Sequence, residues 1–201
     1  MEKNDALKKY RGKRDFKKTR EPSGDDTREG EGNLFVLQKH DARNLHYDFR
    51  LEIDGVLKSW ALPKGPSTDP RENRLALPTE DHPMEYADFE GTIPEDEYGA
   101  GTVMIWDRGI YRNLREEKDD DGKTAAESYD EGKIEVFLEG EKLQGGYALI
   151  RTGTGKKERW LLKKMKDDHA DARRNPVSTE PRSVVSGRSM EEIDEERKNS
   201  T

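Results

Sequence analysis

The stretch QKHDARNLHYDFRLEIDGVLKSWAL (residues 38–62) contains two runs of alternating polar and apolar residues on either side of Asp54-Gly55. Successive side chains of an extended strand point to opposite faces, so residues two apart share a face. In the first run the polar face holds His46, Asp48, Arg50 and Glu52, and the apolar face holds Tyr47, Phe49, Leu51 and Ile53. A slip of one residue would bury the polar set, so the apolar set fixes the register. The stretch therefore predicts a strand with one polar face.

The Asp54-Gly55 dipeptide favours a two-residue hairpin turn, because both central residues of that turn need a positive φ. Other short runs rich in β-branched and aromatic residues are separated by Gly, Pro, Asn and Asp. The predicted strands cover residues 34–37, 46–53, 56–62, 74–77, 102–106, 109–113, 133–138, 147–151 and 159–162. Helix is indicated only at residues 1–10 and 123–129. This pattern predicts an all-β fold, a barrel or a sandwich, with short peripheral helices.

The composition divides the chain into parts. Charged residues make up 40% of the 201 residues and hydrophobic residues 30%, which is too polar for one uniformly packed domain. We expect a flexible basic arm over residues 1–32, a folded domain over 33–166, and a disordered tail over 167–201. The acidic stretch 116–131 is predicted to be a solvated loop within the folded domain.

The charge is unevenly distributed along the chain. The 37 Lys and Arg against 44 Asp and Glu leave a net charge of −7, yet residues 1–20 carry nine basic and three acidic side chains. Because contacts to phosphate are local and screened, such an arm can hold a polyanion on an acidic body, or it can serve only as a solubilising tail. No run approaches the roughly 20 apolar residues of a membrane span, and the amino terminus has no signal-peptide pattern. We expect a cytoplasmic protein.

One constellation of side chains suggests a metal site. The chain has no Cys, so His, Asp and Glu are the available ligands. His46 and Asp48 share a strand face at a Cα separation of roughly 6.6 Å, and His40 could return to them through a turn. Arg50, next on that face, could hold the oxygens of a metal-bound phosphate. The alternative is that this face is simply the exposed side of an edge strand.

Several chemistries remain open for this constellation. Without a Gly-x-Ser-x-Gly elbow or a Cys, covalent acyl chemistry has no candidate nucleophile. Water activated by a metal is the alternative, with His82 as general acid or as partner of an oxyanion, although His82 could also be a surface loop residue. Two His and one carboxylate also describe non-haem Fe(II) oxygenases, but there the distal His follows His-x-Asp, whereas His40 precedes it. The many Arg and Lys favour phosphate chemistry, and a non-catalytic module that binds DNA ends is a third hypothesis.

Three long motifs carry a family resemblance. They are FVLQKHDARNLHYDFRLEIDGVLKSWALPKGPS (35–67), EDHPMEYADFEGTIPEDEYGAGTVMIWDRG (80–109) and RWLLKKMKD (159–167). In this order they resemble the 3′-phosphoesterase domain of the bacterial end-joining DNA ligase D and its stand-alone archaeal relatives, over about residues 8–168. The resemblance implies a compact β-barrel over 33–166. It also implies manganese-dependent removal of a 3′-terminal ribonucleoside and then of the 3′-phosphate, which leaves a 3′-hydroxyl.

The resemblance also implies roles for individual residues. The metal ligands would be His40, His46 and Asp48. The catalytic set would comprise Arg50 and His82 at the scissile phosphate, Tyr86 close by, Lys64 and Arg74 completing the anion pocket, and Gln38, which matches an active-site position. Mn²⁺ is the implied cofactor, with Co²⁺, Zn²⁺ or Cu²⁺ as substitutes, because two imidazoles and a carboxylate accept many divalent ions.

The arm shares in the resemblance. YRGKRDFKKTREPSG (10–24) is similar to the family's Arg-Asp-Phe-x-x-Thr-x-Glu-Pro segment. Arg14, Asp15 and Glu21 are therefore candidates for binding the terminal ribonucleoside in the phosphodiesterase step, which makes the arm part of the active site. The implied partners are DNA 3′ ends that bear a ribonucleotide or a phosphate. Since the chain stops at Thr201 without a ligase or polymerase region, we expect a separate ligase to complete joining, in association with a prokaryotic nucleoid.

Overall fold

A computed structural model describes residues 6–25, 32–118 and 122–199. Nine antiparallel strands form one sheet: β1 (Leu34–Asp41), β2 (Leu45–Ile53), β3 (Val56–Leu62), β4 (Arg74–Pro78), β5 (Gly91–Ile93), β6 (Gly101–Asn113), β7 (Lys133–Gly140), β8 (Gln144–Arg151) and β9 (Trp160–Lys164). The strand order is β1-β2-β3-β4-β9-β8-β7-β6, and β6 pairs again with β1. Eight strands therefore close a barrel, while β5 pairs with the first part of β6. The predicted all-β barrel is confirmed.

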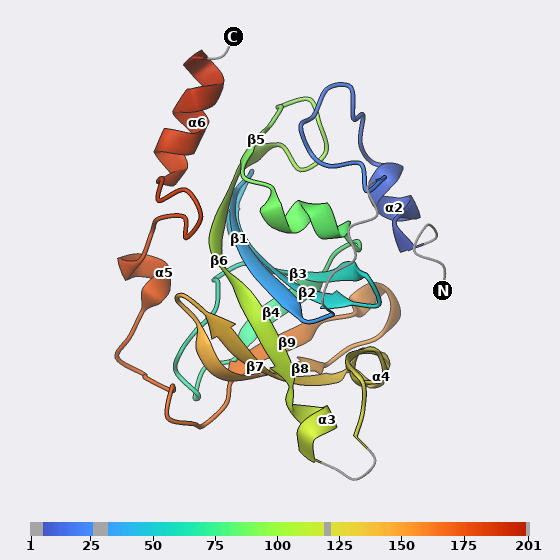
Figure 1. Cartoon of the computed structure of the whole chain (residues 1–201), viewed down its shortest axis with the longest axis vertical. Coiled ribbons are helices and arrows are strands. Elements are labelled where there is room, and N and C mark those ends of the chain that lie inside the picture. Colours follow the sequence, from blue (N-terminus) through green and yellow to red (C-terminus); the bar gives the residue numbers. More distant parts are fainter. Residues whose placement is uncertain (1–5, 26–31, 119–121, 200–201) are drawn as a thin grey trace.

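Short helices surround the barrel (Figure 1). They are α2 (Lys8–Arg11), the 3₁₀ turn η1 (Met84–Asp88), α3 (Leu114–Lys118), α4 (Ala125–Glu131), the 3₁₀ turn η2 (Gly155–Lys157), α5 (Pro176–Thr179) and α6 (Met190–Asn199). The helix predicted at 123–129 is α4, which begins with a capping box at Thr124 and ends at a left-handed Gly132. The helix predicted at 1–10 is reduced to α2, and residues 1–5 lie outside the described residues. Helices α3 and α4 also occupy much of the predicted acidic loop.

The β2–β3 hairpin has the predicted turn, because Asp54 and Gly55 both have positive φ, 52° and 73°. The apolar face of β2 lies inside the barrel, as the register argument required. There Tyr47 and Phe49 pack with the three tryptophans Trp60, Trp106 and Trp160. The opposite face of β2 is not a solvated face, since Asp48 is 6% exposed and Arg50 is 2% exposed.

A second apolar layer covers this outer face of β1, β2 and β3. It is built from α2, η1 and outward-facing residues of β1, β3, β5 and β6. Tyr10 and Tyr86 are its main covering side chains, with ring centroids 6.0 Å apart. In Figure 1 the blue α2 and the green η1 lie together on one side of β1 to β3. The polar side chains of β2 are therefore enclosed between the barrel wall and this cover.

The tail predicted to be disordered differs from the structure. Residues 167–199 follow the barrel surface and include α5 and α6. The Val184 amide donates to the carbonyl of Ile105 (3.1 Å), and the Trp106 indole donates to the carbonyl of Glu180 (2.8 Å). Ile193 of α6 is only 3% exposed. Composition suggested disorder because the tail has few apolar residues. Four of these, Val177, Val184, Met190 and Ile193, nevertheless pack against the apolar clusters, and backbone carbonyls of the tail accept hydrogen bonds from Trp106 and Lys142.

Within the described ranges, none of the helices combines the length and apolar character needed to cross a membrane.

Candidate active site

A cluster of three potential ligands lies on β1 and β2. His40 and His46 are directly paired across the two strands, and Asp48 is two residues further along β2. One ligand atom from each residue lies within 4.8 Å of the others. Asp48 is 3.6 Å from His40 Nδ1 and 3.7 Å from His46 Nε2. Among the described residues, no other group of three His or acidic side chains is arranged this way. The structure thus brings together the predicted ligands.

Two backbone carbonyls orient the imidazoles. His40 Nε2 lies 2.9 Å from the carbonyl oxygen of Gly99, and His46 Nδ1 lies 2.8 Å from that of Asn44. A carbonyl can only accept, so each of these ring nitrogens carries the proton. The unprotonated nitrogens are then His40 Nδ1 and His46 Nε2, the two that lie near Asp48. This arrangement is typical of metal-binding histidines, whose second nitrogen donates to a carbonyl or a carboxylate. The donor set fits a divalent cation.

Asp48 also connects the cluster to Arg50. Burial alone would raise the pKa of Asp48, but the Arg50 guanidinium outweighs it and holds the pKa well below the usual range. The Asp48 carboxylate accepts from Arg50 Nη2 at 3.2 Å. Asp48 is therefore ionised, as a metal ligand must be.

Arg50 is held rigidly in place. Its Nε donates to Gln38 Oε1 (2.8 Å) and its Nη1 donates to the Ser59 hydroxyl (2.8 Å). Gln38 is fully buried and donates in turn to the carbonyls of Tyr86 and Phe89 (both 2.9 Å). Gln38 therefore positions Arg50 and fastens the η1 segment to the barrel. Sequence reasoning missed Ser59, although it is the cross-strand partner of Arg50 and a small polar residue on the same face.

His82 is buried on the outer wall of the barrel and is not an exposed loop residue. A backbone bridge with Leu57 of β3 fixes it, through hydrogen bonds of 2.8 and 3.0 Å. Its Nδ1 lies 3.0 Å from Arg50 Nη1 and 2.8 Å from the Glu80 carbonyl. Burial, followed by the positive charges of Arg50 and Arg14, lowers the pKa of His82 well below its ordinary value, so the imidazole is neutral. The oxygenase alternative required a histidine downstream of Asp48 in the cluster, but the third member of the cluster is the upstream His40.

Residues of the amino-terminal arm form buried ion pairs beside this group of side chains. Arg14 Nε donates to Glu21 (2.9 Å), and Tyr86 donates its hydroxyl proton to the same carboxylate oxygen (3.1 Å). Arg14 Nη1 also pairs with Glu80 (3.1 Å). Burial raises the pKa of Tyr86 well above its usual value, which keeps this hydroxyl protonated. Glu80 was not predicted, although it lies only two residues before His82.

Three predicted site residues lie apart from this cluster. Asp15 is exposed, and its carboxylate accepts from the Lys17 amide (3.1 Å) in a turn of the arm. Lys64 is exposed two residues beyond the end of β3. Arg74 donates to Glu72 (2.6 Å) and lines a hollow of about 120 Å³ together with Arg174 of the tail. The structure does not bring these three side chains into contact with the cluster of His40, His46 and Asp48.

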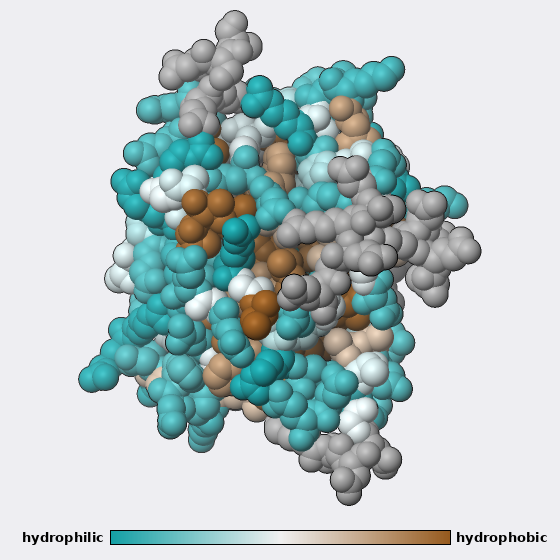
Figure 2. Space-filling view, in the orientation of Figure 1, coloured by the Kyte–Doolittle hydropathy of each residue, from teal (hydrophilic) through white to brown (hydrophobic). Residues whose placement is uncertain are grey.

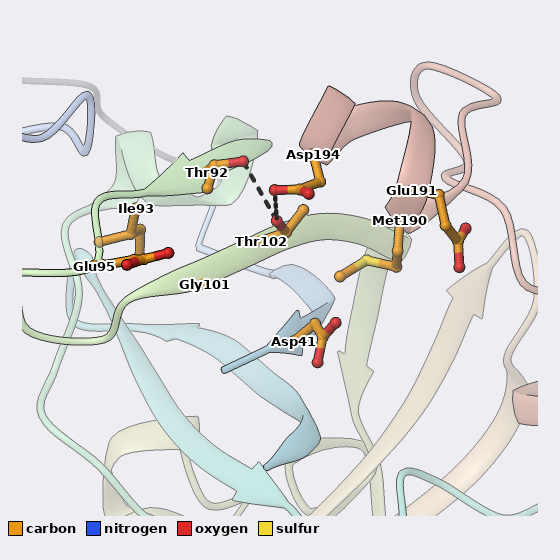
Figure 3. A pocket seen from close by; sticks show the side chains of 9 residues that line it. All are labelled: Asp41, Thr92, Ile93, Glu95, Gly101, Thr102, Met190, Glu191 and Asp194. Atoms are coloured by element: carbon orange, nitrogen blue, oxygen red, sulfur yellow. Dashed lines mark hydrogen bonds between the residues drawn. The ribbon is translucent and has the colours of Figure 1, made fainter. Parts of the chain in front are cut away.

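A second, acidic hollow of about 320 Å³ lies between β5, β6 and α6 (Figure 3). Four carboxylates line it, those of Asp41, Glu95, Glu191 and Asp194. Its polar floor includes Thr102, which contacts Thr92 (3.3 Å) and Asp194 (3.4 Å). Asp41 directly follows the ligand His40 but lines this hollow and not the metal cluster. The carboxylates do not gather closely enough to form a ligand group within the described part of the chain.

The fold and the cluster together define a β-barrel protein whose outer wall carries three side chains that could hold a metal ion, beside a buried guanidinium. A family model for the DNA ligase D 3′-phosphoesterase domain matches residues 38–151, more than half of the chain. The chain belongs to this family, and the expected resemblance is confirmed.

Curated relatives agree with the family match. A multifunctional non-homologous end joining protein LigD of Pseudomonas aeruginosa is 48% identical over 195 residues, covering 94% of this chain and 22% of that protein. A multifunctional non-homologous end joining DNA repair protein LigD of Mycobacterium tuberculosis is 49% identical over 164 residues, covering 81% of this chain and 20% of that protein. A LigD of Mycolicibacterium smegmatis is 48% identical over 164 residues, with 81% and 21% covered. The chain thus spans about a fifth of the length of these relatives.

Proposed function

We propose that this chain is a metal-dependent hydrolase that heals DNA 3′ ends. It removes a 3′-terminal ribonucleoside as a phosphodiesterase and a 3′-phosphate as a phosphomonoesterase, leaving a 3′-hydroxyl. The observation that carries the proposal is that Asp48 contacts both the histidine cluster and Arg50. A cation and a guanidinium on either side of one carboxylate can bind the same phosphate. Membership of the 3′-phosphoesterase family supports this assignment.

His40, His46 and Asp48 would hold the cation, through two imidazole nitrogens and a carboxylate oxygen. Such a donor set accepts Mn²⁺, which we propose as the cofactor, and also Co²⁺, Zn²⁺ or Cu²⁺. When bound, the cation supplies charge neutralisation at a phosphate oxygen and lowers the pKa of a water. The access route lies beside His46, whose side chain is 23% exposed, while the side chains of His40 and Asp48 are below 10%.

Arg50 would bind the phosphate oxygens with its remaining donor capacity. Gln38, Ser59 and Asp48 already fix the guanidinium, so it needs no reorganisation when charge develops in the transition state. Neutral His82 is placed to take or give a proton at a ring nitrogen next to Arg50. A phosphate anion would offset the positive field of Arg50 and Arg14 and raise the pKa of His82 toward its ordinary value.

The arm and the outlying basic residues would recognise the DNA strand. Glu21 contacts both Arg14 and Tyr86, so Arg14 and Glu21 would belong to the wall of the active site. Asp15 is exposed and could meet a ribose hydroxyl. Lys64 follows β3, and Arg74 begins the neighbouring strand β4. Both lie at the barrel end near His46, where they could contact nucleotides further from the reacting phosphate. We propose a cytoplasmic, nucleoid-associated protein whose product is sealed by a separate ligase.

The direct test is phosphate release from a primer–template that carries a 3′-phosphate, with and without Mn²⁺. The wild-type chain is expected to release phosphate only with the cation. A parallel substrate with one 3′-terminal ribonucleotide should lose its nucleoside. A chain that binds these ends and Mn²⁺ but converts neither substrate would contradict the proposal and favour a binding module.

A further inference from the structure

Tyr98 lies in the loop between β5 and β6, and the residue after it contacts a proposed metal ligand. The carbonyl of the next residue, Gly99, is the hydrogen-bond partner of His40 Nε2 at 2.9 Å. A Cβ atom at Gly99 would lie 4.0 Å from His40 Cε1, so the loop backbone approaches the imidazole closely. Yet the tyrosine itself is 49% exposed. Among the exposed large hydrophobic residues of the described ranges, only Val185 has an equally high value.

Basic side chains of the arm surround the Tyr98 ring. Lys13 Nζ lies 4.4 Å from the ring centroid and donates to the Tyr98 hydroxyl at 3.1 Å. The Arg14 guanidinium carbon lies 5.5 Å from the same centroid and 3.8 Å from that of Tyr10. Tyr10 in turn packs on His82 with a centroid distance of 5.0 Å. Tyr98 is thus linked to the ligand His40 on one side and to His82 on the other.

This position suits a nucleobase. An exposed aromatic ring flanked by cations is the usual platform on which proteins stack the bases of single-stranded ends. If a 3′-phosphate lies at the metal cluster and Arg50, the base of the same nucleotide lies only one sugar away. Figure 1 shows the loop that follows β5 beside the blue arm, at the same side of the barrel as η1. The free face of Tyr98 is therefore within reach of that base.

We propose that Tyr98 stacks on the terminal nucleobase of the strand whose 3′-phosphate occupies the active site. The inference rests on the proposed function and names the group that recognises the end. Tyr98 is then a specificity-determining residue that reads the presence of a base and not its identity, because every base offers a π face. The competing explanation is that Tyr98 only anchors the arm through Lys13.

The test compares two primer–templates that differ only in the 3′-terminal nucleotide, which is either normal or abasic, both with a 3′-phosphate. For Tyr98→Ala, KM on the normal substrate should rise about five- to a hundredfold, the range of alanine substitution at stacking aromatics. On the abasic substrate KM should change less than about twofold, because no base is there to stack. Tyr98→Phe keeps the ring and should behave as wild type. If Tyr98 only anchored the arm through its hydroxyl, Tyr98→Phe would not behave as wild type.

Matched controls separate stacking from damage to the site. Ile150→Ala removes another exposed apolar side chain, on β8, and should affect neither substrate. Calorimetric titration with Mn²⁺ should give the same affinity for Tyr98→Ala and wild type, which shows that His40 keeps its position. Equal effects of Tyr98→Ala on both substrates, or no effect on either, would overturn the inference.

A second measurement does not depend on catalysis. The terminal base is replaced by 2-aminopurine, whose fluorescence is quenched on stacking, and the protein is titrated without metal. Quenching is expected with wild type and Tyr98→Phe but not with Tyr98→Ala. Quenching by all three variants would refute the stacking role. A wild-type chain that quenches the probe but releases no phosphate would instead refute the proposed function alone.

Discussion

The Tyr86 hydroxyl donates a hydrogen bond to the Glu21 carboxylate at 3.1 Å, and this contact joins the amino-terminal arm to the wall of the metal site. The two residues are 65 positions apart in the chain. The same Glu21 oxygen accepts from Arg14, which also lies 3.8 Å above the ring of Tyr10. The arm is therefore a structural part of the site and not only a charged attachment to it.

Removing one metal ligand should abolish activity without unfolding the barrel. His46→Ala is expected to lower phosphate release by more than about a hundredfold and to weaken Mn²⁺ binding, because one of three donors is lost. The thermal midpoint of the metal-free protein should stay within a few degrees, since His46 lies outside the apolar core. His169→Ala, in the tail and away from the cluster, is the control. Full activity of His46→Ala with unchanged Mn²⁺ affinity would refute the ligand assignment.

Gln38 should matter for both stability and catalysis. Gln38→Ala removes three buried hydrogen bonds, one that it accepts from Arg50 and two that it donates to carbonyls of the η1 segment. We expect a loss of about 2–4 kcal/mol in the free energy of unfolding and a fall in kcat larger than the change in KM, because Arg50 is no longer oriented. Urea denaturation and steady-state kinetics measure the two effects.

The control for this change is Gln144→Ala, an exposed glutamine whose single hydrogen bond reaches the Gly140 carbonyl at 3.3 Å. It should alter the free energy of unfolding by less than about 0.5 kcal/mol. If Gln38→Ala is as harmless as Gln144→Ala, then the buried network does not hold Arg50.

The contact between Tyr86 and Glu21 should appear as coupling in a double-mutant cycle. Tyr86→Phe removes one hydrogen bond to a charged group, and Glu21→Gln weakens that bond together with the ion pair to Arg14. The part that the two variants share should make their losses in the free energy of unfolding non-additive by about 1–2 kcal/mol. Tyr111→Phe with Glu21→Gln is the matched pair without contact, since the Tyr111 hydroxyl donates to the Glu52 carbonyl. That pair should be additive. Additivity in both pairs would mean that the arm and η1 are energetically independent.

Lys142 should make stability depend on alkaline pH. Burial lowers the pKa of Lys142 from 10.5 to about 8, against the opposing effect of Asp107. Between these values the unfolded chain binds more protons at this residue than the folded chain does, so Lys142 contributes a rise in the free energy of unfolding with pH. The contribution of Lys142 is about 2 kcal/mol between pH 7 and pH 9.5, and about 3 kcal/mol over the whole window. Urea unfolding at intervals from pH 7 to pH 9.5 measures it, because at higher pH the raised pKa values of buried tyrosines such as Tyr10 and Tyr147 lower the free energy of unfolding.

Two variants test the source of this slope. Lys142→Met has no titrating group, and Lys142→Arg stays charged throughout, so both should lack the rise that wild type has. Both should also loosen the tail, because Lys142 Nζ donates to the carbonyls of Glu180 and Arg182. An identical pH slope in all three proteins would contradict the assignment to Lys142.

The sequence determined the barrel strands and the face on which the chemistry lies. The Asp54-Gly55 turn and the alternation of Tyr47, Phe49, Leu51 and Ile53 fix the β2–β3 register, because period-two patterns and turn geometry are local properties. That register alone places His46, Asp48 and Arg50 in one row. The spacing to His40 was sufficient to predict the third member of the cluster, since a tight turn returns β1 to β2.

Only the tertiary structure decided what covers that row and what holds each side chain in it. The contact of the Gly99 carbonyl with His40 and the ion pairs of Arg14 with Glu21 and Glu80 join segments that no local pattern connects. The same holds for the tail, whose few apolar residues suggested disorder until the barrel surface supplied their partners. Alternation specifies that a face is polar, but it cannot specify whether solvent or another part of the chain lies against it.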